Sequence, residues 1–250
     1  MTATVSQPPA GGRVLAGSVG VAVAAVVLWE IGSHLSFVIP PPLDTARALA
    51  ADLTDALFLV NLRETMLAAT AAFLLSAAIG GLIGLGLGLS RVARLLLSPI
   101  VTAMNGVPKI VLYPILLPVF HLGYGSKIVM GVLFGLFPVL INVMTGVQQI
   151  PSVYWRLARS VRAGRWQTLR HILLPAIRGP LLTGVRLAIS LSLVGVVLSE
   201  FFATKYGLGR VVLRSYSAGD YPNMMGTILL LIAVSFVLSL LLWRMERRVR

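Results

Sequence analysis

The chain has 250 residues, of which 57% are hydrophobic and only 12% charged, and its mean hydropathy is +0.91. A soluble domain carries about 25% charged residues, so this composition excludes an ordinary water-soluble protein. The formal net charge of +13 does not indicate a nucleic-acid partner, because the positive residues cluster between apolar stretches. The lack of cysteine excludes a disulfide framework and a thiolate metal site. We therefore expect an all-α integral membrane protein.

Six apolar segments approach or exceed the roughly 20 residues that a helix needs to cross a bilayer. They lie at residues 14–34, 64–90, 95–120, 127–147, 177–203 and 224–243. The polar, Pro- and Gly-rich residues 1–13 predict a disordered cytoplasmic tail. No small-residue cleavage pattern follows Val14 closely, so residues 14–60 are expected to hold a retained first transmembrane helix and an outer segment.

The second segment contains glycines at a spacing of four residues, namely Gly80, Gly84 and Gly88. A dinucleotide-binding loop is the alternative explanation for such a run. The segment is uncharged throughout, and this spacing puts small residues on one helix face, where a neighbouring helix can approach closely. We therefore predict a helix-packing face.

The third segment contains four prolines, at positions 99, 108, 114 and 118. Broken helices are tolerated in membranes where they line a cavity or are buried in protein, so we predict a bent segment that forms a wall of a translocation pathway.

Two charges, Lys109 and Glu200, fall inside or near the ends of predicted spans, where a charge costs about 2.5–3.5 kcal/mol. Lys109 either faces the pathway and helps an anionic solute to cross, or it pairs with Glu200 or a helix-end carbonyl and only holds the spans together. Both explanations stay open. The polar candidates for the pathway are Asn105, Lys109, Tyr113, Asn142 and Glu200.

Positive charge is distributed unequally between the two sides of the predicted spans. One side has a single acid, Glu246, and these arginines: Arg13, Arg91, Arg94, Arg156, Arg159, Arg162, Arg165, Arg170, Arg178, Arg244, Arg247, Arg248 and Arg250. The other side has Arg47, Arg63, Lys127, Lys205, Arg210 and Arg214, and balances them with five acids: Asp44, Asp52, Asp55, Glu64 and Asp220. Because positive loops stay inside, both termini are predicted to be cytoplasmic.

The loop "YWRLARSVRAGRWQTLRHILLPAIRGP" at 154–180 is the most basic part of the chain. Its arginines recur every three residues from Arg156 to Arg165, which predicts one basic flank on a helix beginning near Pro151. Gly164 is predicted to end this helix, and a second short helix would follow before Pro175. Such a pair, lying along the membrane, would contact either anionic lipid or a cytosolic partner.

Several motifs in this chain are similar to those of a known family. "AGRWQTLRHILLP", with Gly164, Ile172, Leu174 and Pro175, resembles the second half of the cytoplasmic loop motif of ABC importer permeases. "PPLDTARAL", "GVPKIVLYPILLPVFHLGYGSKI" and "LSEFFATKYGLG" resemble the sulfonate/nitrate/taurine branch of that family, and the resemblance covers roughly residues 40 to 247. One departure is Ala158, which stands where the family usually has an acid.

The resemblance implies a type I ABC importer permease fold of six transmembrane helices, with its core at residues 61–247. It implies a homodimer, two cytosolic ATPase subunits that hold ATP and Mg, and an external solute-binding protein. The loop at 151–178 would bind the ATPase through these residues: Trp155, Arg156, Ala158, Arg159, Arg162, Gly164, Ile172, Leu174 and Pro175. This chain has no phosphate-binding loop, so we expect it to be a subunit without enzymatic activity, cofactor or metal.

The expected function is translocation of a small solute through the bacterial cytoplasmic membrane. The resemblance implies a sulfonate, nitrate, a taurine-like compound or another small organic anion. The alternative is a secondary transporter or channel driven by an ion gradient, which would leave the arginine loop with lipid contact alone. The stretch "KYGLGRVVLRSYSAGDYPN" after the fifth segment is predicted to be a turn-rich outer loop that, by resemblance, meets the binding protein.

Overall fold

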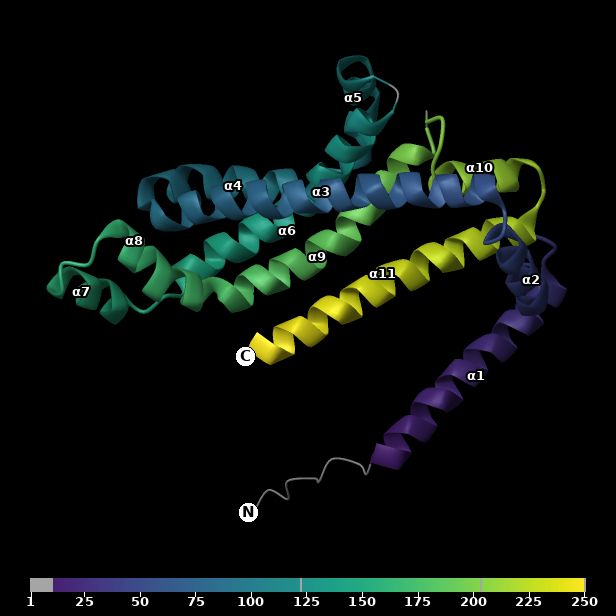
Figure 1. The fold of residues 1–250 in the computed structure, drawn as a ribbon, viewed down its shortest axis with the longest axis horizontal. Coiled ribbons are helices and arrows are strands. Elements are labelled where there is room, and N and C mark those ends of the chain that lie inside the picture. Colours follow the sequence, from purple (N-terminus) through teal and green to yellow (C-terminus); the bar gives the residue numbers. More distant parts are fainter. Residues whose placement is uncertain (1–10, 122, 203, 250) are drawn as a thin grey trace.

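A computed structural model describes residues 11–121, 123–202 and 204–249, and within these ranges the chain is helical with no β-strand. Three long helices, α3 (Ala56–Leu89), α6 (Tyr124–Gln148) and α9 (Leu174–Glu200), lie alongside one another, with α11 (Tyr221–Val249) beside α9 (Figure 1). The shorter helices and the N-terminal helix are α1 (Gly11–Leu35), α2 (Pro42–Asp52), α4 (Arg91–Gly106), η1 (Lys109–Leu112), α5 (Tyr113–Phe120), α7 (Ser152–Ser160), α8 (Arg165–Thr168), η2 (Leu169–Leu173) and α10 (Leu208–Ser217).

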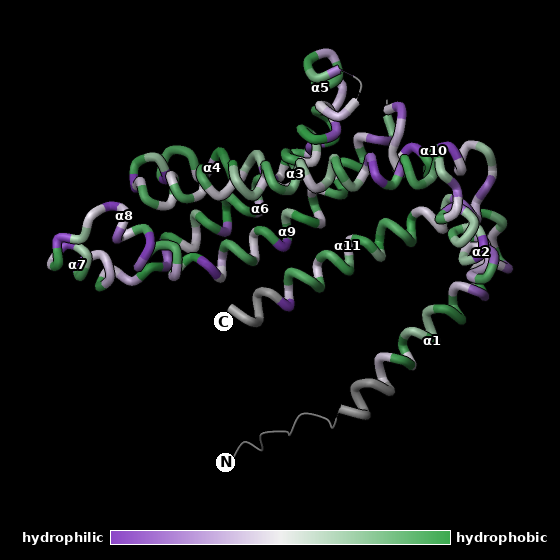
Figure 2. The backbone as a smooth tube through the Cα atoms, in the orientation of Figure 1, coloured by the Kyte–Doolittle hydropathy of each residue, from purple (hydrophilic) through white to green (hydrophobic). Residues whose placement is uncertain are grey.

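The membrane-spanning character of the chain is confirmed. Five helical segments among the described residues are long and apolar enough to cross a bilayer, and a sixth span results if the bent pair of α4 with η1 and α5 counts as one. The two halves of that pair meet at 90° around Val107 and Pro108, which confirms that the proline-rich third segment is not a straight helix. Hydrophobic residues cover the long helices, whereas hydrophilic ones gather near α7 and α8 and near α2 and α10 (Figure 2).

The fifth predicted segment begins earlier than its hydropathy indicates. A continuous helical stretch runs from Arg165 to Glu200, so the predicted break before Pro175 is wrong. The five residues of η2 form a π-helical turn that ends at Leu173, two residues before this proline. Proline removes one backbone donor, and the wider turn lets the helix continue through the site.

The segment between α9 and α11 is also more ordered than predicted. It contains the amphipathic helix α10, in which Leu208, Gly209 and Val212 are buried, rather than a turn-rich loop. At the same end, α2 packs against α11. The Nε1 of Trp29 in α1 donates a hydrogen bond to the carbonyl of Pro40, while α1 otherwise leaves its apolar residues 17–35 exposed. Of the predicted tail, residues 1–10 lie outside the described residues, and 11–13 begin α1.

The predicted glycine face is confirmed as the contact between α3 and α6. A Cβ added to Gly80 or Gly84 would lie 2.7 Å from a carbonyl oxygen of α6, belonging to Leu136 or Leu140 respectively. Next to this contact, α6 and α9 enclose a buried cluster that includes Val139, Val143 and Ala188. The backbones of α3, α6 and α9 are therefore in close contact, and a larger side chain at these glycines would push the helices apart.

We expect Gly84→Ala to lower the free energy of unfolding by about 1–3 kcal/mol, because the obstructing atom belongs to the backbone and cannot turn away. Gly86→Ala on the same helix is the matched control, since nothing lies within 4 Å of its added Cβ. Unfolding of the purified protein in detergent would measure both. Equal stability of the two variants would show that the α3–α6 contact is looser than described.

Candidate functional site

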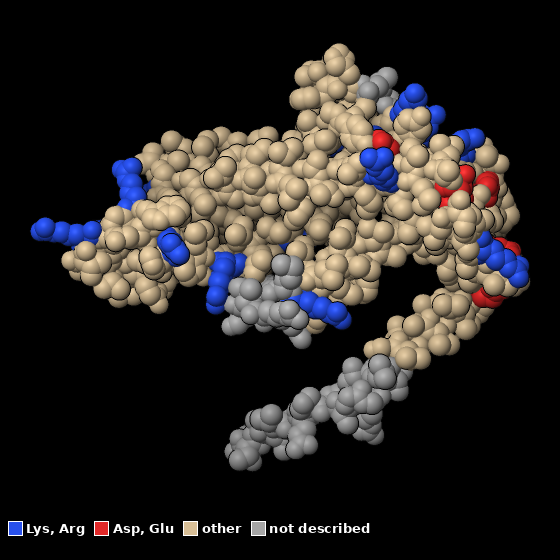
Figure 3. Space-filling view, viewed as in Figure 1, with Lys and Arg blue, Asp and Glu red and all other residues tan. Residues whose placement is uncertain are grey.

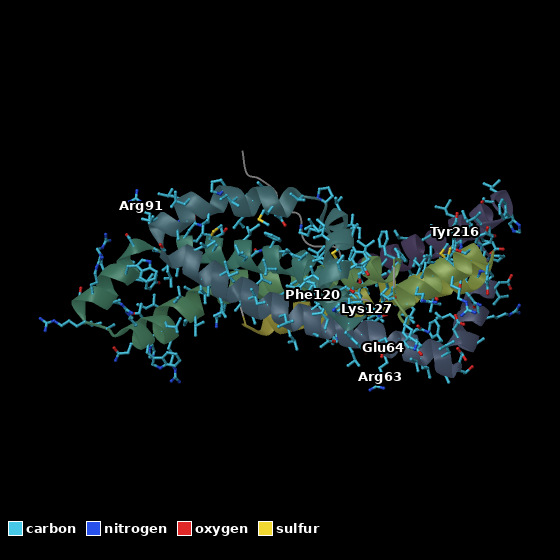
Figure 4. The ribbon with its side chains drawn as sticks, turned by 90° about the horizontal axis from the view of Figure 1, so that it is seen from above. Arg63, Glu64, Arg91, Phe120, Lys127 and Tyr216 are labelled. Atoms are coloured by element: carbon cyan, nitrogen blue, oxygen red, sulfur yellow. The ribbon has the colours of Figure 1, made fainter. Side chains whose placement is uncertain are left out.

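A buried ion pair joins α6 to α9 at the end of the bundle that carries α10. Lys127 in the first turn of α6 places its Nζ 3.0 Å from Oε1 of Glu200, the last residue of α9. The two side chains are 3% and 0% exposed, and Lys127 lies within the bundle in Figure 4. Two charges at this depth are tolerable only when paired and hydrogen-bonded, so each partner requires the other.

The remaining hydrogen-bonding capacity of Glu200 is also used. Thr65 Oγ1 of α3 lies 3.0 Å and 2.9 Å from the two carboxylate oxygens, and the backbone N–H of Gly209 donates to Oε2 at 2.9 Å. The carboxylate therefore contacts α3, α6 and the first turn of α10 at once.

The same side chains fix the connection between α9 and α10. Gly207 donates its backbone N–H to Asn61 Oδ1 at 2.7 Å, and Leu208 donates to Thr65 Oγ1 at 2.8 Å. Lys127 also donates to the carbonyl of Tyr206. We call Asn61, Thr65, Lys127 and Glu200 the outer latch, because they hold this connection against three helices.

Only glycine fits at position 207, next to the outer latch. Its φ is +140°, a conformation that side-chain-bearing residues rarely adopt, and an added Cβ would lie 2.2 Å from the carboxyl carbon of Glu200. The close approach of backbone to carboxylate therefore depends on a glycine.

The proposed pairing of Lys109 with Glu200 is wrong. Lys109 Nζ instead donates to the carbonyl of Asn105 near the end of α4, at 2.9 Å, which is the helix-end carbonyl of the same alternative. The ammonium also lies 5.7 Å and 5.2 Å from the ring centres of Phe134 and Phe137. Sequence reasoning missed Lys127 because it was counted among the outer positive charges. The sequence did contain a signal: Lys127 begins the predicted span 127–147 on the same side of the membrane as Glu200, near the end of the span 177–203.

The five pathway candidates do not form one cluster. Asn105 and Lys109 lie together at the bend, whereas Tyr113 is buried with its ring 5.3 Å from that of Phe202. Asn142 donates to the carbonyl of Pro138 at 2.8 Å and lines a separate cavity of about 360 Å³ between α6 and α9. Glu200 is occupied within the outer latch.

Of the predicted helical pair, the first helix is present as α7, whereas the second is only α8, the first turn of the stretch that continues into α9. Both lie at the opposite end of the bundle from α10 (Figure 1). The inner face of this pair is apolar: Ala158 is buried, and Trp155, Leu169 and Ile172 pack against the cluster containing Ile150 and Leu173. Leu174 and Pro175 are exposed. The pair is thus anchored by apolar contacts to the bundle.

The arginines of this pair lie on its outside. Those at positions 156, 159, 162, 165 and 170 are all exposed, and none forms an ion pair with a described residue. Lys and Arg side chains mark the α7 end of the space-filling view, whereas Asp and Glu side chains appear near α2 and α10 (Figure 3). Burial and the neighbouring carboxylates of Asp220 and Asp55 raise the pKa of Asp52 at that second end.

The joint between α7 and α8 differs from the prediction that Gly164 ends the first helix. Arg162 takes the left-handed conformation, with φ +48°, and the N–H of Ala163 donates to the carbonyl of Ala158 at 2.8 Å. A left-handed residue that satisfies the last carbonyls is what ends a helix, and here it precedes the glycine. Gly164 instead begins α8, donating its N–H to Gln167 Oε1 at 2.8 Å.

We expect Lys127→Met to lower the free energy of unfolding by about 3–5 kcal/mol, because it leaves the Glu200 carboxylate buried without its cation. Adding Glu200→Gln to the same chain should recover part of this loss, and Arg63→Met, at an exposed outer position, should change little. A double-mutant cycle of unfolding in detergent measures the coupling. Additive effects of the two latch substitutions would contradict the pairing.

The chain was compared with known proteins. The sequence model of the family described as "binding-protein-dependent transport system inner membrane component" matches residues 76–250. The riboflavin transport system permease protein RibX of Chloroflexus aurantiacus is 28% identical over 226 residues, which are 89% of this chain and 84% of that protein. The taurine transport system permease protein TauC of Escherichia coli is 27% identical over 243 residues, 92% of this chain and 87% of that protein.

A putative aliphatic sulfonates transport permease protein, SsuC of Bacillus subtilis, is 23% identical over 227 residues, 89% of this chain and 82% of that protein. Among solved structures, an inward-facing conformation of the MetNI methionine ABC transporter superposes with a TM-score of 0.70 at 19% identity, covering 78% of this chain and 96% of that chain. This likeness confirms the type I permease fold.

The family match covers α7, α8 and both members of the buried ion pair. The relatives named for taurine and sulfonates confirm the resemblance to that branch. A secondary transporter or channel driven by an ion gradient is not what these matches indicate. The chain belongs to the binding-protein-dependent transport system inner membrane components, the permease subunits of ABC importers.

Proposed function

We propose that two copies of this chain form the membrane pathway of an importer for a small organic anion. Two cytosolic ATPase subunits, which hold ATP and Mg, bind the segment at 151–178, and an external binding protein delivers the solute. The chain itself moves solute and makes no covalent bonds. The observation that supports this proposal best is the exposed basic pair of helices α7 and α8 at one end of the bundle.

The outer face of α7 has the character of a docking surface. Val153, Leu157 and Val161 recur every four residues and are 54%, 54% and 65% exposed, with Arg156 and Arg159 beside them. An exposed apolar stripe with a basic flank fits a partner groove that is apolar at its centre and lined by carboxylates.

Ala158 explains how the segment tolerates the loss of the family's usual acid. Its side chain faces the protein and is 7% exposed, so it is placed for anchoring rather than for contact with a partner. In this chain the polar contacts to the ATPase are therefore assigned to arginines, led by Arg159 and Arg162.

The helix that follows supplies a route for movement. The stretch from Arg165 to Glu200 is continuous over 36 residues, or about 54 Å at 1.5 Å per residue. One end lies in the basic pair and the other carries the carboxylate of the outer latch. A displacement of α8 by the ATPase would thus be transmitted along one helix to the opposite end of the bundle.

The direction across the membrane follows from charge. The α7 end carries unpaired arginines and the α10 end carries the acids, so the α7 end is assigned to the cytoplasm. The C-terminal end of α11 points towards the α7 end (Figure 1), in keeping with cytoplasmic termini. The membrane is then the bacterial cytoplasmic membrane.

The anionic solute is supported by Lys109 and by some of the relatives, whereas others are named for riboflavin and formylaminopyrimidine. The Lys109 ammonium is partly exposed at the bend between α4 and α5, beside two aromatic rings, where a passing anion can meet it. Relatives are named for taurine, aliphatic sulfonates and nitrate. The pathway at the bend would thus favour negative charge.

We expect the double substitution Arg159→Glu, Arg162→Glu to release the ATPase subunits, because it reverses one exposed charge on α7 and one in the joint that follows it. Affinity purification of the tagged chain in mild detergent, followed by mass spectrometry, measures the stoichiometry. The matched control is Arg47→Glu, Arg63→Glu, which reverses two exposed charges at the outer end. Retention of the ATPase by the first variant, or equal loss in both, would contradict the assignment of the docking surface.

We expect Lys109→Met to reduce ATP-dependent uptake about tenfold while the complex still assembles. The reason is that an anion in a low-dielectric pathway would lose its attraction to the lysine charge. Lys109→Arg, which keeps the charge, should restore most of the uptake. Uptake into proteoliposomes and co-purification of the ATPase would be measured on the same preparations. Failure of Lys109→Met to assemble, or normal uptake, would show that the side chain has only a structural role.

A further inference from the structure

A cavity of about 690 Å³ lies beside the outer latch. It is formed by the end of α9, the connection to α10 and α10 itself. Its apolar lining comes from Phe201, Phe202 and Leu213, and its basic lining comes from Lys205, Arg210 and Arg214.

The charge around this cavity is positive and uncompensated. None of the three basic side chains forms an ion pair with a described residue; Arg210 donates to the carbonyl of Thr204, and Lys205 lies over the ring of Tyr206. Glu200 also lines the cavity, but its carboxylate is already bonded by Lys127, Thr65 and Gly209. The cavity therefore offers three cations and no available carboxylate among its described lining.

The acids of the outer end belong to a different cavity. Asp52, Asp55 and Asp220 line a space of about 300 Å³ formed by α2, α3, α10 and the start of α11. Arg214 lines both spaces without pairing to any of these acids within 4.0 Å. These three acids thus line only the smaller cavity, which leaves the larger cavity basic.

We propose that the larger cavity is an outer receiving site that binds the solute before it enters the pathway, and that its ligand is an organic anion with an apolar body and a terminal sulfonate, carboxylate or similar group. This inference rests on the proposed function and specifies the solute class. The cations bind the charged group, and the two phenylalanines with Leu213 contact the apolar body.

The combination of walls predicts selectivity. A small inorganic anion would interact only with the cations. An alkyl or aryl anion would also remove apolar surface from water, which is worth on the order of 0.8 kcal/mol for each buried CH₂ in small-molecule transfer. A neutral molecule with the same apolar body would contact only the apolar side chains of the cavity. Affinity should therefore rise both with negative charge and with chain length.

The test uses the full-length chain in nanodiscs of zwitterionic lipid and three probes: pentane-1-sulfonate, methanesulfonate and pentan-1-ol. Binding is measured by saturation-transfer NMR titration at low and high salt. Pentane-1-sulfonate should bind tightest, and its affinity should fall with salt because the cations are exposed to solvent.

Two variants separate the roles of charge and wall. Lys205→Gln with Arg214→Gln should weaken pentane-1-sulfonate by about tenfold, a reasonable loss for two charges at a hydrated site, while Arg63→Gln, an exposed outer cation away from the cavity, leaves it unchanged. Phe202→Ala, at a side chain that is 61% exposed, should lower the ratio of pentane-1-sulfonate to methanesulfonate affinity while keeping the preference for anions. All are surface changes that spare the latch.

Equal binding of pentane-1-sulfonate and pentan-1-ol would overturn the receiving site, as would a loss in Arg63→Gln equal to that in the double variant. Co-purification of the ATPase and ATP-dependent uptake are measured on the same protein. If assembly and uptake persist without selective anion binding, only this inference fails. If the chain retains no ATPase, the proposed function fails independently of what the cavity binds.

Discussion

The ion pair between Lys127 and Glu200 is the contact on which the outer half of the protein depends. Removing two charges from water costs several kcal/mol for each ion, and this cost is offset only where the geometry supplies every hydrogen bond. Here the partners come from three helices and from the backbone after α9, so none of these elements can move alone without exposing a charge. The latch therefore makes the outer ends of α3, α6 and α9 one rigid unit together with the start of α10.

The packing of the bundle extends that rigidity towards the other end. Glycines of α3 place its backbone against carbonyls of α6, and α6 shares a buried cluster with α9. Interiors packed this closely respond to force by moving as bodies, because no space exists for continuous deformation. The 36-residue helix that ends in Glu200 begins with α8, so the basic pair and the latch are parts of the same body. The bent α4–α5 segment packs against this body through Lys109, which lies beside Phe134 and Phe137 of α6, and through the buried Tyr113.

Local sequence patterns predicted what depends on local physics. Hydropathy located the spans, the spacing of Gly80 and Gly84 located a packing face, and the prolines near Lys109 located the bend. The failures involve information that no window contains. Lys127 and Glu200 are 73 residues apart, α10 is amphipathic and too short to read from composition, and the helix through Pro175 continues because of a π turn. Which charge meets which is decided by packing, and packing is a property of the whole bundle.

Under the proposed function, charge has to satisfy two opposed demands in this protein. Orientation requires the cytoplasmic side to be more positive, whereas capture of an anion requires positive charge outside. The structure meets the first demand by placing exposed arginines on α7 and α8 with no described acid nearby. It meets the second by separating the outer charges: Asp52, Asp55 and Asp220 line the smaller cavity, Lys205 and Arg210 line the larger one, and Arg214 lines both. Summed over the outer side, the positive and negative charges nearly cancel, so the orientation of the chain in the membrane is not disturbed. Around the cavity the charges do not cancel, and the net charge there is positive. A single short helix thus allows one membrane side to be nearly neutral on average and locally basic where a solute would arrive.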